Sequence, residues 1–243
     1  MKKKSTNKGL LMVGSLPKSG LTFYLRQGQV VVRTAHSDHK RSMTRPQFIQ
    51  RQKMRHTMAL WQMLKFCDVM FTEYPTAYRN FASLANRLPA VFVPNIGLMS
   101  QASFLMPGIP VSDGSLPTVK EELDEVNGVP ALLTNLKTAD WSYEEKLLLY
   151  TAVQRIESDL PRVRFSMREV SWDEMTAING RYALVNEEFA DETKGWALVR
   201  VVNNRCSPQT IVTRCTLYQQ YTTEEALEIA ADSYGGLTEN GAL

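Results

Sequence analysis

The sequence predicts an α+β fold in which an N-terminal β-hairpin and two helices are followed by a β-sandwich. Two observations predict this order. The longest helical pattern starts at Thr44, and short β-rich runs separated by turn residues fill the chain after residue 130. We expect two domains: a basic hairpin–helix module with an extended connector at residues 1–119, and the sandwich at residues 120–243. A chain of 243 residues is long enough for both.

Two β-rich runs, residues 21–26 and 29–34, predict the N-terminal hairpin, with Gln27-Gly28 between them. A two-residue connection with Gly in second place is typical of a tight turn, because Gly tolerates a positive φ. The first run alternates apolar and polar residues, which predicts a ribbon buried on one side.

A capping signal opens the long helix. Thr44 can cap it, Pro46 lies in the first turn, and Gln47 completes a capping box. The first half of the helix is basic, whereas the half from Met58 to Phe71 is apolar on nearly every side. We therefore expect the first half to project into solvent or onto a ligand, and the second half to belong to the core.

The apolar half of this helix needs a packing partner. A second helix is predicted over residues 75–86, after a proline and with apolar residues along one side. We expect a surface of Met58, Trp61, Leu64 and Met70 to pack against this second helix or against another subunit.

Strand-forming runs dominate the second half of the chain. They are predicted at residues 131–136, 146–156, 163–171, 180–185, 195–202 and 209–218. Turn signals separate several of them, at Ser158-Asp159, Asn179-Gly180 and Asn203-Asn204. Short strands at regular spacing are typical of a sandwich.

One strand has a helical alternative. Ser142 and Glu145 form a second capping box, so residues 147–156 also fit a helix. The β-branched residues of this run favour the strand. A short helix over residues 224–231 is expected near the C-terminus.

Composition limits the cellular context. No apolar run approaches the roughly 20 residues of a membrane span, so we expect no membrane partner. The N-terminal lysines resemble a signal peptide, but the apolar run after them is short and lacks a cleavage site, which favours an unprocessed, cytoplasmic protein. Of the three cysteines, Cys67 is expected to be buried, and Cys206 and Cys215 could either pair or stay free.

The net charge of +3 hides a strong asymmetry. Residues 1–56 hold 13 Lys and Arg against one acidic residue, whereas the rest of the chain has a charge of −9. Eight basic residues are expected to contact a polyanion or an acidic partner: Arg26, Arg33, Lys40, Arg41, Arg45, Arg51, Lys53 and Arg55. Nucleic acid and an acidic protein surface both fit this pattern. The acidic half of a neighbouring subunit is favoured, because no aromatic ladder accompanies the arginines.

Catalytic signatures are weak. His36, Asp38 and His39 could together bind a zinc or nickel ion, although a solvated polar loop explains them more simply. No set of nucleophile, base and oxyanion donors converges in the sequence, so we expect no enzyme activity, cofactor or small-molecule substrate. The expected function is that of a self-assembling structural or interaction protein. A nucleic-acid-binding protein is the second interpretation, and a metal-dependent enzyme is a distant third.

The chain resembles a domain-of-unknown-function family of gut Bacteroidota. The resemblance rests on Thr-x-x-Gln-x-x-x-Arg at Thr44 to Arg51, on Asp113-Gly114-Ser115-Leu116-Pro117, and on Gly195-Trp196-Ala197-Leu198. Further matching positions are Gly14, Gly20, Gly28, Gln29, Val30, Arg33 and Trp61. The hairpin–helix part is also similar to a module of phage-encoded proteins. The resemblance implies an immunoglobulin-like C-terminal domain, a phage or mobile-element context and no catalytic residues.

Overall fold

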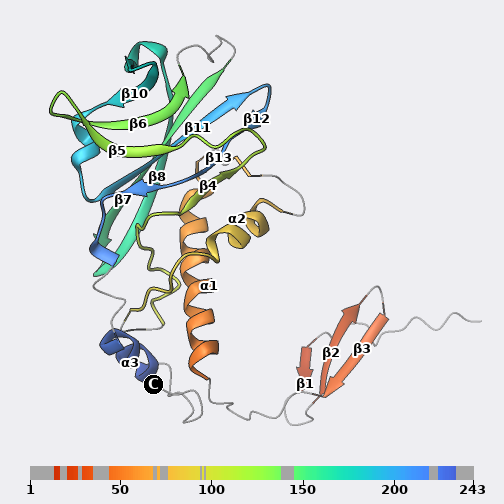
Figure 1. Cartoon of the computed structure of the whole chain (residues 1–243). Coiled ribbons are helices and arrows are strands. Elements are labelled where there is room, and N and C mark those ends of the chain that lie inside the picture. Colours follow the sequence, from red (N-terminus) through yellow and green to blue (C-terminus); the bar gives the residue numbers. More distant parts are fainter. Residues whose placement is uncertain are drawn as a thin grey trace, which may run out of the picture. The chain divides into compact units, whose positions relative to one another are not determined.

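The computed structural model is α+β and rich in antiparallel strands (Figure 1). It describes residues 14–16, 21–26, 29–34, 44–67, 70–71, 76–93, 95, 97–137, 145–218 and 224–233. The chain divides into two compact units, residues 1–42 and 43–243. Within these described ranges, none of the helices has the length and apolar character needed to cross a bilayer.

The first unit is a small antiparallel sheet. It contains β1 (Gly14–Leu16), β2 (Leu21–Arg26) and β3 (Gln29–Thr34), in the order β1-β2-β3. The predicted hairpin is therefore confirmed, although its turn residues lie outside the described part of the chain. The register pairs Phe23 with Val32 and Leu25 with Val30.

Two helices begin the second unit. The helix α1 (Arg45–Leu64) starts after Thr44, whose backbone N–H donates to Oε1 of Gln47 at 3.2 Å, so the predicted capping residues are confirmed. It ends at Leu64 rather than near residue 71, because Met70 already forms a parallel bridge with Ser112. The helix α2 (Ala77–Ala85) follows, and the hydroxyl of its N-cap Thr76 accepts from the N–H of Arg79.

The remaining elements are mostly strands. In chain order they are β4 (Pro110–Asp113), β5 (Glu121–Val126), β6 (Val129–Lys137), β7 (Lys146–Glu157), β8 (Leu160–Val170), the short η3 (Trp172–Glu174), β9 (Met175–Ile178), β10 (Arg181–Val185), η4 (Glu187–Ala190), β11 (Lys194–Val202), β12 (Arg205–Cys206), β13 (Pro208–Thr210), β14 (Val212–Thr213) and the final helix α3 (Glu224–Ser233). One sheet has the order β5-β6-β10-β9, and another the order β12-β11-β7-β8 with β14 beside β11. The strand interpretation of residues 146–156 is confirmed, whereas the single strand expected at 209–218 is wrong. Its residues divide between β13, which pairs with β4, and β14, which pairs with β11.

Tight turns close the hairpins. Both central residues have positive φ at Ser158-Asp159 (52° and 62°), Asn179-Gly180 (49° and 75°) and Asn203-Asn204 (50° and 60°), as the sequence predicted. A fourth turn of this kind, Asn127-Gly128, joins β5 to β6. Turns with two positive φ angles match the right-handed twist of the flanking strands.

The central strands β7 and β11 are buried on both faces along most of their length. On one face Leu149, Trp196 and Leu198 pack against Leu132 and Leu184 of the four-stranded sheet. Phe189 of η4 meets the Trp196 ring edge-on, with ring centroids 4.9 Å apart. Two sheets therefore enclose one apolar layer.

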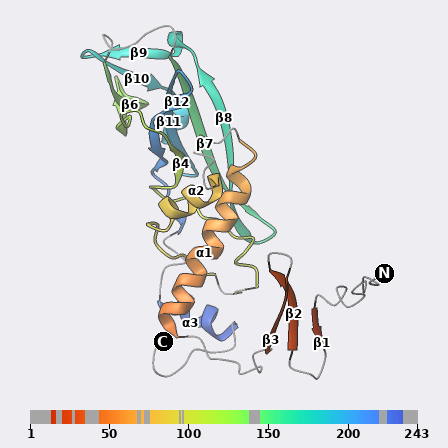
Figure 2. The same ribbon diagram turned by 90° about the vertical axis from the view of Figure 1, so that its right-hand side faces the viewer.

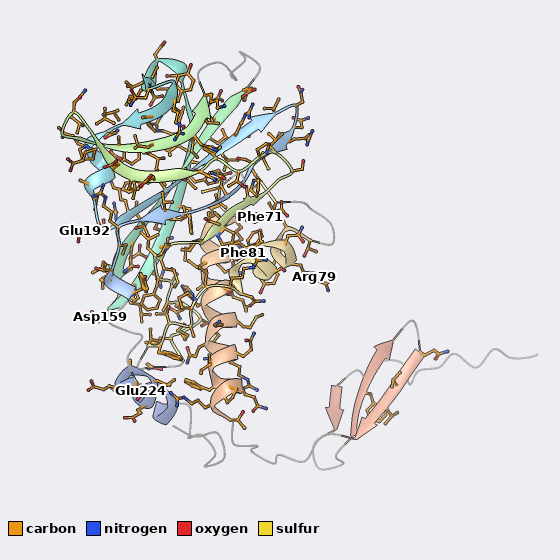
Figure 3. The ribbon with its side chains drawn as sticks, in the orientation of Figure 1. Phe71, Arg79, Phe81, Asp159, Glu192 and Glu224 are labelled. Carbon is orange, nitrogen blue, oxygen red and sulfur yellow. The ribbon has the colours of Figure 1, made fainter. Side chains whose placement is uncertain are left out.

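The opposite face of the same strands is covered by helices. Tyr150 and Ala197 pack in one cluster with Leu60 and Leu64 of α1 and with Phe81 of α2. Figure 2 shows the ribbons of α1 and α2 beside β7 and β8. Figure 3 places Phe71 and Phe81 together where the two helices approach the strands. This main core joins residues from both sides of the predicted boundary between 119 and 120, which lies inside the second unit.

Residues 88–111 complete this core. They were expected to form part of an extended connector, and they contain little regular structure. Their apolar side chains are nevertheless enclosed: Val91, Met99, Phe104, Leu105, Met106 and Ile109 have 0% exposure. The segment thus covers the sheet beside α1 and α2 instead of linking two separate cores.

The first half of α1 is buried along one face. Phe48, Gln52, His56 and Leu60, four residues apart in turn, are inaccessible or nearly so. The expectation that this half projects wholly into solvent or onto a ligand is therefore wrong for this face. At its N-terminal end Phe48 packs with Phe92 and with α3, which lies beside that end of α1 in Figures 1 and 2.

Candidate functional site

The N-terminal sheet is an exposed apolar surface within a basic unit. Val30 and Val32 of β3 are 45% and 53% exposed, and Phe23, opposite Val32, is half-buried. Arg26 and Arg33 occupy the alternate positions of the ladder, paired with Gln29 and Thr22. Residues 1–42 carry a charge of +8, and residues 43–243 carry −5.

Several residues predicted for a basic or metal site lie outside the described part of the chain. They are His36, Asp38, His39, Lys40 and Arg41. Among the residues that are described, no group of three His, Cys, Asp or Glu side chains could hold a metal ion.

The basic residues of α1 have different surroundings. Arg45 forms an ion pair with Glu224 of α3 at 3.5 Å, so one basic side chain meets an acidic partner within the same chain. Arg51 is exposed, whereas Lys53 and Arg55 are half-buried. Arg51 and Arg55 are four residues apart, on adjacent turns of the same helical face.

The four residues predicted as a packing surface are not equivalent. Leu64 is fully buried, Trp61 and Met70 are half-buried against the main core, and Met58 is 48% exposed. The indole of Trp61 contacts the rings of Phe81 and Tyr78, with centroids 5.3 and 5.8 Å away, so it packs on α2. A hollow of about 230 Å³ opens between Met58, Trp61, Gln62 and Tyr78.

Two larger clefts share one wall. The first, of about 690 Å³, lies between the end of α2 and the strands β4 and β13. The second, of about 620 Å³, lies over β6 and β10. Lys120 and Glu121, at the start of β5, line both clefts.

Glu121 carries the most perturbed carboxyl of the described residues. Its Oε1 accepts hydrogen bonds from the N–H of Leu198, at 2.6 Å, and from the side-chain amide of Gln209. Its Oε2 is closed off from solvent and has no hydrogen-bond partner within the described part of the chain. Burial raises the pKa of Glu121 to about 8, against the lowering effect of the two hydrogen bonds.

The position of this carboxyl follows from a gap in the sheet. Along one edge of β11, β14 pairs with Gly195 and Trp196, and β12 pairs with Val201 and Val202. The N–H of Leu198 falls between these two short strands, and Glu121 supplies its acceptor. A side chain thus takes the place of a missing strand partner.

A buried polar network holds Glu121 in place. The side chain of Gln209 accepts from the N–H of Val119 at 3.1 Å and donates to the Val119 carbonyl at 2.8 Å. The N–H of Gln209 donates to the hydroxyl of Ser112, which in turn donates to the carbonyl of Ser207. These bonds tie β5, β13 and β4 together at the junction of the two clefts.

The other reactive side chains are closed off by burial. His56 is buried, its Nε2 accepts from the N–H of Phe104 at 3.1 Å, and burial lowers its pKa to about 4. Cys206 and Cys215 are buried thiols outside any disulfide, and desolvation raises their pKa, whereas the thiol of Cys67 is half-buried.

Sequence reasoning missed Glu121 because it opens an acidic run, residues 121–125, that is typical of a solvated segment. A signal was nevertheless present. Glu121 is in phase with Leu123, which packs against the inner layer between the sheets. A carboxylate at an inward position of an alternating strand indicates a buried charge.

The chain matches no family model, and no curated protein and no solved structure is similar to it. The proposals below therefore depend on the residues and contacts of this chain.

Proposed function

We propose that this chain is a non-enzymatic interaction protein that self-assembles through its N-terminal sheet. The observation that carries the proposal is the exposed apolar pair Val30 and Val32 on a unit whose described residues form a three-stranded sheet. Such a small sheet is stable only when its apolar face is covered. The same face of a second copy is a self-complementary cover.

The size of this face sets the strength of the contact. The strands β2 and β3 have six residues each and β1 has three. They span about 20 Å, 20 Å and 10 Å, and at a spacing of about 4.8 Å they give a face of roughly 240 Å². Two such faces bury roughly 500 Å² together, which is less than the 1,200 Å² or so of stable interfaces. The association is therefore weak and concentration-dependent.

Charge separation supports the same function. The first unit carries +8 and the second −5, so the basic residues of one copy attract the acidic residues of another. This attraction weakens with salt, since exposed charges are screened.

Nucleic-acid binding is the second candidate. The +8 charge of residues 1–42, with Arg26 and Arg33 on adjacent strands, supports it. Binding of this kind falls steeply with salt, because phosphate contacts release counterions.

We further infer that the two packed sheets form an immunoglobulin-like sandwich. Two antiparallel sheets with a buried tryptophan, Trp196, between them support this interpretation. A sandwich attached to a self-associating module fits the phage or mobile-element context that the family resemblance implies.

The test is sedimentation velocity and light scattering on the full chain, with and without duplex DNA at two salt concentrations. The wild type is expected to dimerise or assemble further as its concentration rises. The double variant Val30→Asp, Val32→Asp is expected to stay monomeric. Val31→Asp makes the same change at the intervening position of β3, and should retain the association.

A wild-type chain that stays monomeric at every concentration contradicts self-assembly. Salt-sensitive binding of that monomer to DNA, unchanged by Val30→Asp and Val32→Asp, would establish the nucleic-acid alternative instead.

A further inference from the structure

The final helix α3 meets the rest of the chain through a small apolar contact. Ala226 and Leu227 are 9% and 4% exposed, and they pack with Phe48 and Phe92. Glu225, Glu228 and Ile229 are exposed, the last at 46%. Among residues 224–229, whose side chains the structure describes, the docked stripe consists of Ala226 and Leu227.

Phe48 and Phe92 form the floor of the surface beneath α3. Their rings are stacked, with centroids 6.1 Å apart and planes 4° from parallel. Ile49 and Ala90 border this pair as half-buried neighbours. We call this surface, made of Phe48, Ile49, Ala90 and Phe92, the α1 groove.

One turn further along α1 lies an unusual side chain. Gln52 is fully buried, and neither its Nε2 nor its Oε1 has a hydrogen-bond partner in the described part of the chain. Buried side-chain amides in native proteins usually have a hydrogen-bond partner, so Gln52 is an exception within this part of α1.

The helices α3 and α1 carry opposite charges. The sequence of α3 contains four acidic residues and no basic one, whereas α1 contains four Lys and Arg and no acidic residue. Arg45 and Glu224 meet at 3.5 Å at one end of the contact; Figure 3 labels Glu224 on α3 there. Both side chains are solvent-exposed, at 38% and 86%, so this pair orients the helix more than it holds it.

We propose that the α1 groove also accepts the α3 helix of a second copy of this chain. The fit is assured, because an exchanged helix makes the same contacts that α3 makes within its own chain. Among the described side chains of α3, the exchange breaks the apolar contacts of Ala226 and Leu227 and the exposed Arg45–Glu224 pair. The exchanged helix adds a second contact to the self-assembly proposed above. It rests on that proposal, because association of the N-terminal sheets raises the local concentration of chains.

Effective concentration decides between the two arrangements. A helix tethered to its own groove competes at an effective concentration of about 1 mM. In free chains at micromolar concentration, α3 therefore stays docked in the groove of its own chain. Chains held together by their N-terminal sheets reach comparable local concentrations, and exchange then links neighbouring copies. If the tethered helix is docked about nine-tenths of the time, the Kd is about one-ninth of its effective concentration of about 1 mM. The same helix on a separate chain then binds the groove with a Kd of about 100 µM or tighter.

The test is a complementation of two full-length variants, both carrying Val30→Asp and Val32→Asp to remove association through the N-terminal sheet. Leu227→Glu prevents the chain's own α3 from docking and leaves the groove empty. Phe48→Glu destroys the groove and leaves α3 free. Each variant alone should sediment as a monomer at about 300 µM, and an equimolar mixture should form a heterodimer.

Matched controls define the outcome. Ile229→Glu places the same charge on the exposed side of α3, so its own helix stays docked and its mixture with Phe48→Glu should remain monomeric. A monomeric mixture of Leu227→Glu and Phe48→Glu, with both chains folded by circular dichroism, would overturn the proposal. Because the N-terminal sheets are blocked in every sample, this outcome is independent of whether those sheets associate.

A second measurement applies if Phe48→Glu fails to fold. A fluorescent peptide of residues 219–236 should bind the full-length Leu227→Glu chain, with anisotropy reporting a Kd of about 100 µM or tighter. The same peptide with Leu227→Glu should bind at least tenfold more weakly. Equal affinity of the two peptides, or no binding by either at 1 mM, would also overturn the proposal.

Discussion

Replacing Glu121 with Gln tests whether the wall shared by the two clefts contains a buried neutral acid. The pKa of Glu121 is raised by burial to about 8, from an ordinary value of 4.5. The folded state therefore holds this proton up to about pH 8, whereas the unfolded chain releases it near 4.5. The stabilisation is complete below pH 4.5 and is lost as the pH rises towards 8.

The size of the effect follows from that difference. Each tenfold change in the acidity of a group corresponds to about 1.4 kcal/mol. Between pH 4.5 and 8 Glu121 ionises in the unfolded chain but not in the folded one, and this lowers the free energy of unfolding by about 5 kcal/mol. Gln keeps the acceptor for Leu198 and Gln209 and does not ionise. The variant should match the wild type near pH 5 and exceed its unfolding free energy by several kcal/mol at pH 9.

Urea unfolding from pH 5 to 9 measures this directly. The exposed neighbour Glu122 provides the control, since Glu122→Gln makes the same chemical change and should leave the pH profile unaltered. Parallel profiles for the wild type and Glu121→Gln, separated by a constant, would refute the assignment of a buried neutral carboxyl. So would a variant that is less stable than the wild type at every pH.

Three further predictions concern α1. Burial lowers the pKa of His56 to about 4 from 6.5, so the neutral side chain stabilises the fold above pH 6.5. The free energy of unfolding should fall by about 3 kcal/mol as the pH is lowered from 6.5 to 4. Urea unfolding at acidic pH should show this loss for the wild type and not for His56→Gln. Trp61→Ala should lower the free energy of unfolding by about 3 kcal/mol, against less than about 1 kcal/mol for the exposed Met58→Ala, as measured by urea unfolding. The double charge reversal Arg51→Glu, Arg55→Glu should weaken self-association in sedimentation and change the free energy of unfolding by less than about 1 kcal/mol. A variant that assembles as the wild type does would exclude the Arg51–Arg55 face of α1 from the contact between copies.

Local chemistry determined much of the secondary structure. The pairs Ser158-Asp159 and Asn203-Asn204 adopt positive φ because Asn, Asp and, in such turns, Ser tolerate it, and the strands on either side follow from that geometry. Thr44 and Gln47 start α1 where their side chains supply acceptors for free N–H groups. These features depend on neighbours in sequence, so the sequence was sufficient to place them.

The location of burial required the tertiary structure. The described residues between α2 and β4 form no helix or strand, yet many of them are core because they pack with α1, α2 and the central sheet. The helix α1 ends at Leu64 although apolar residues continue, because Met70 pairs with Ser112, which is distant in sequence. Contacts of this kind are set by the meeting of remote segments and leave no local pattern.

Glu121 shows the same division at the candidate site. The sequence determined an acidic run at residues 121–125 and its phase with Leu123. Only the fold decided that the first of these carboxyls fills a gap at one edge of β11, where no strand pairs with Leu198 between β14 and β12 and where Gln209 lies 88 residues from Glu121 in sequence. Desolvation by that enclosure, and not the identity of the residue, changes its protonation, because burial penalises the charged form.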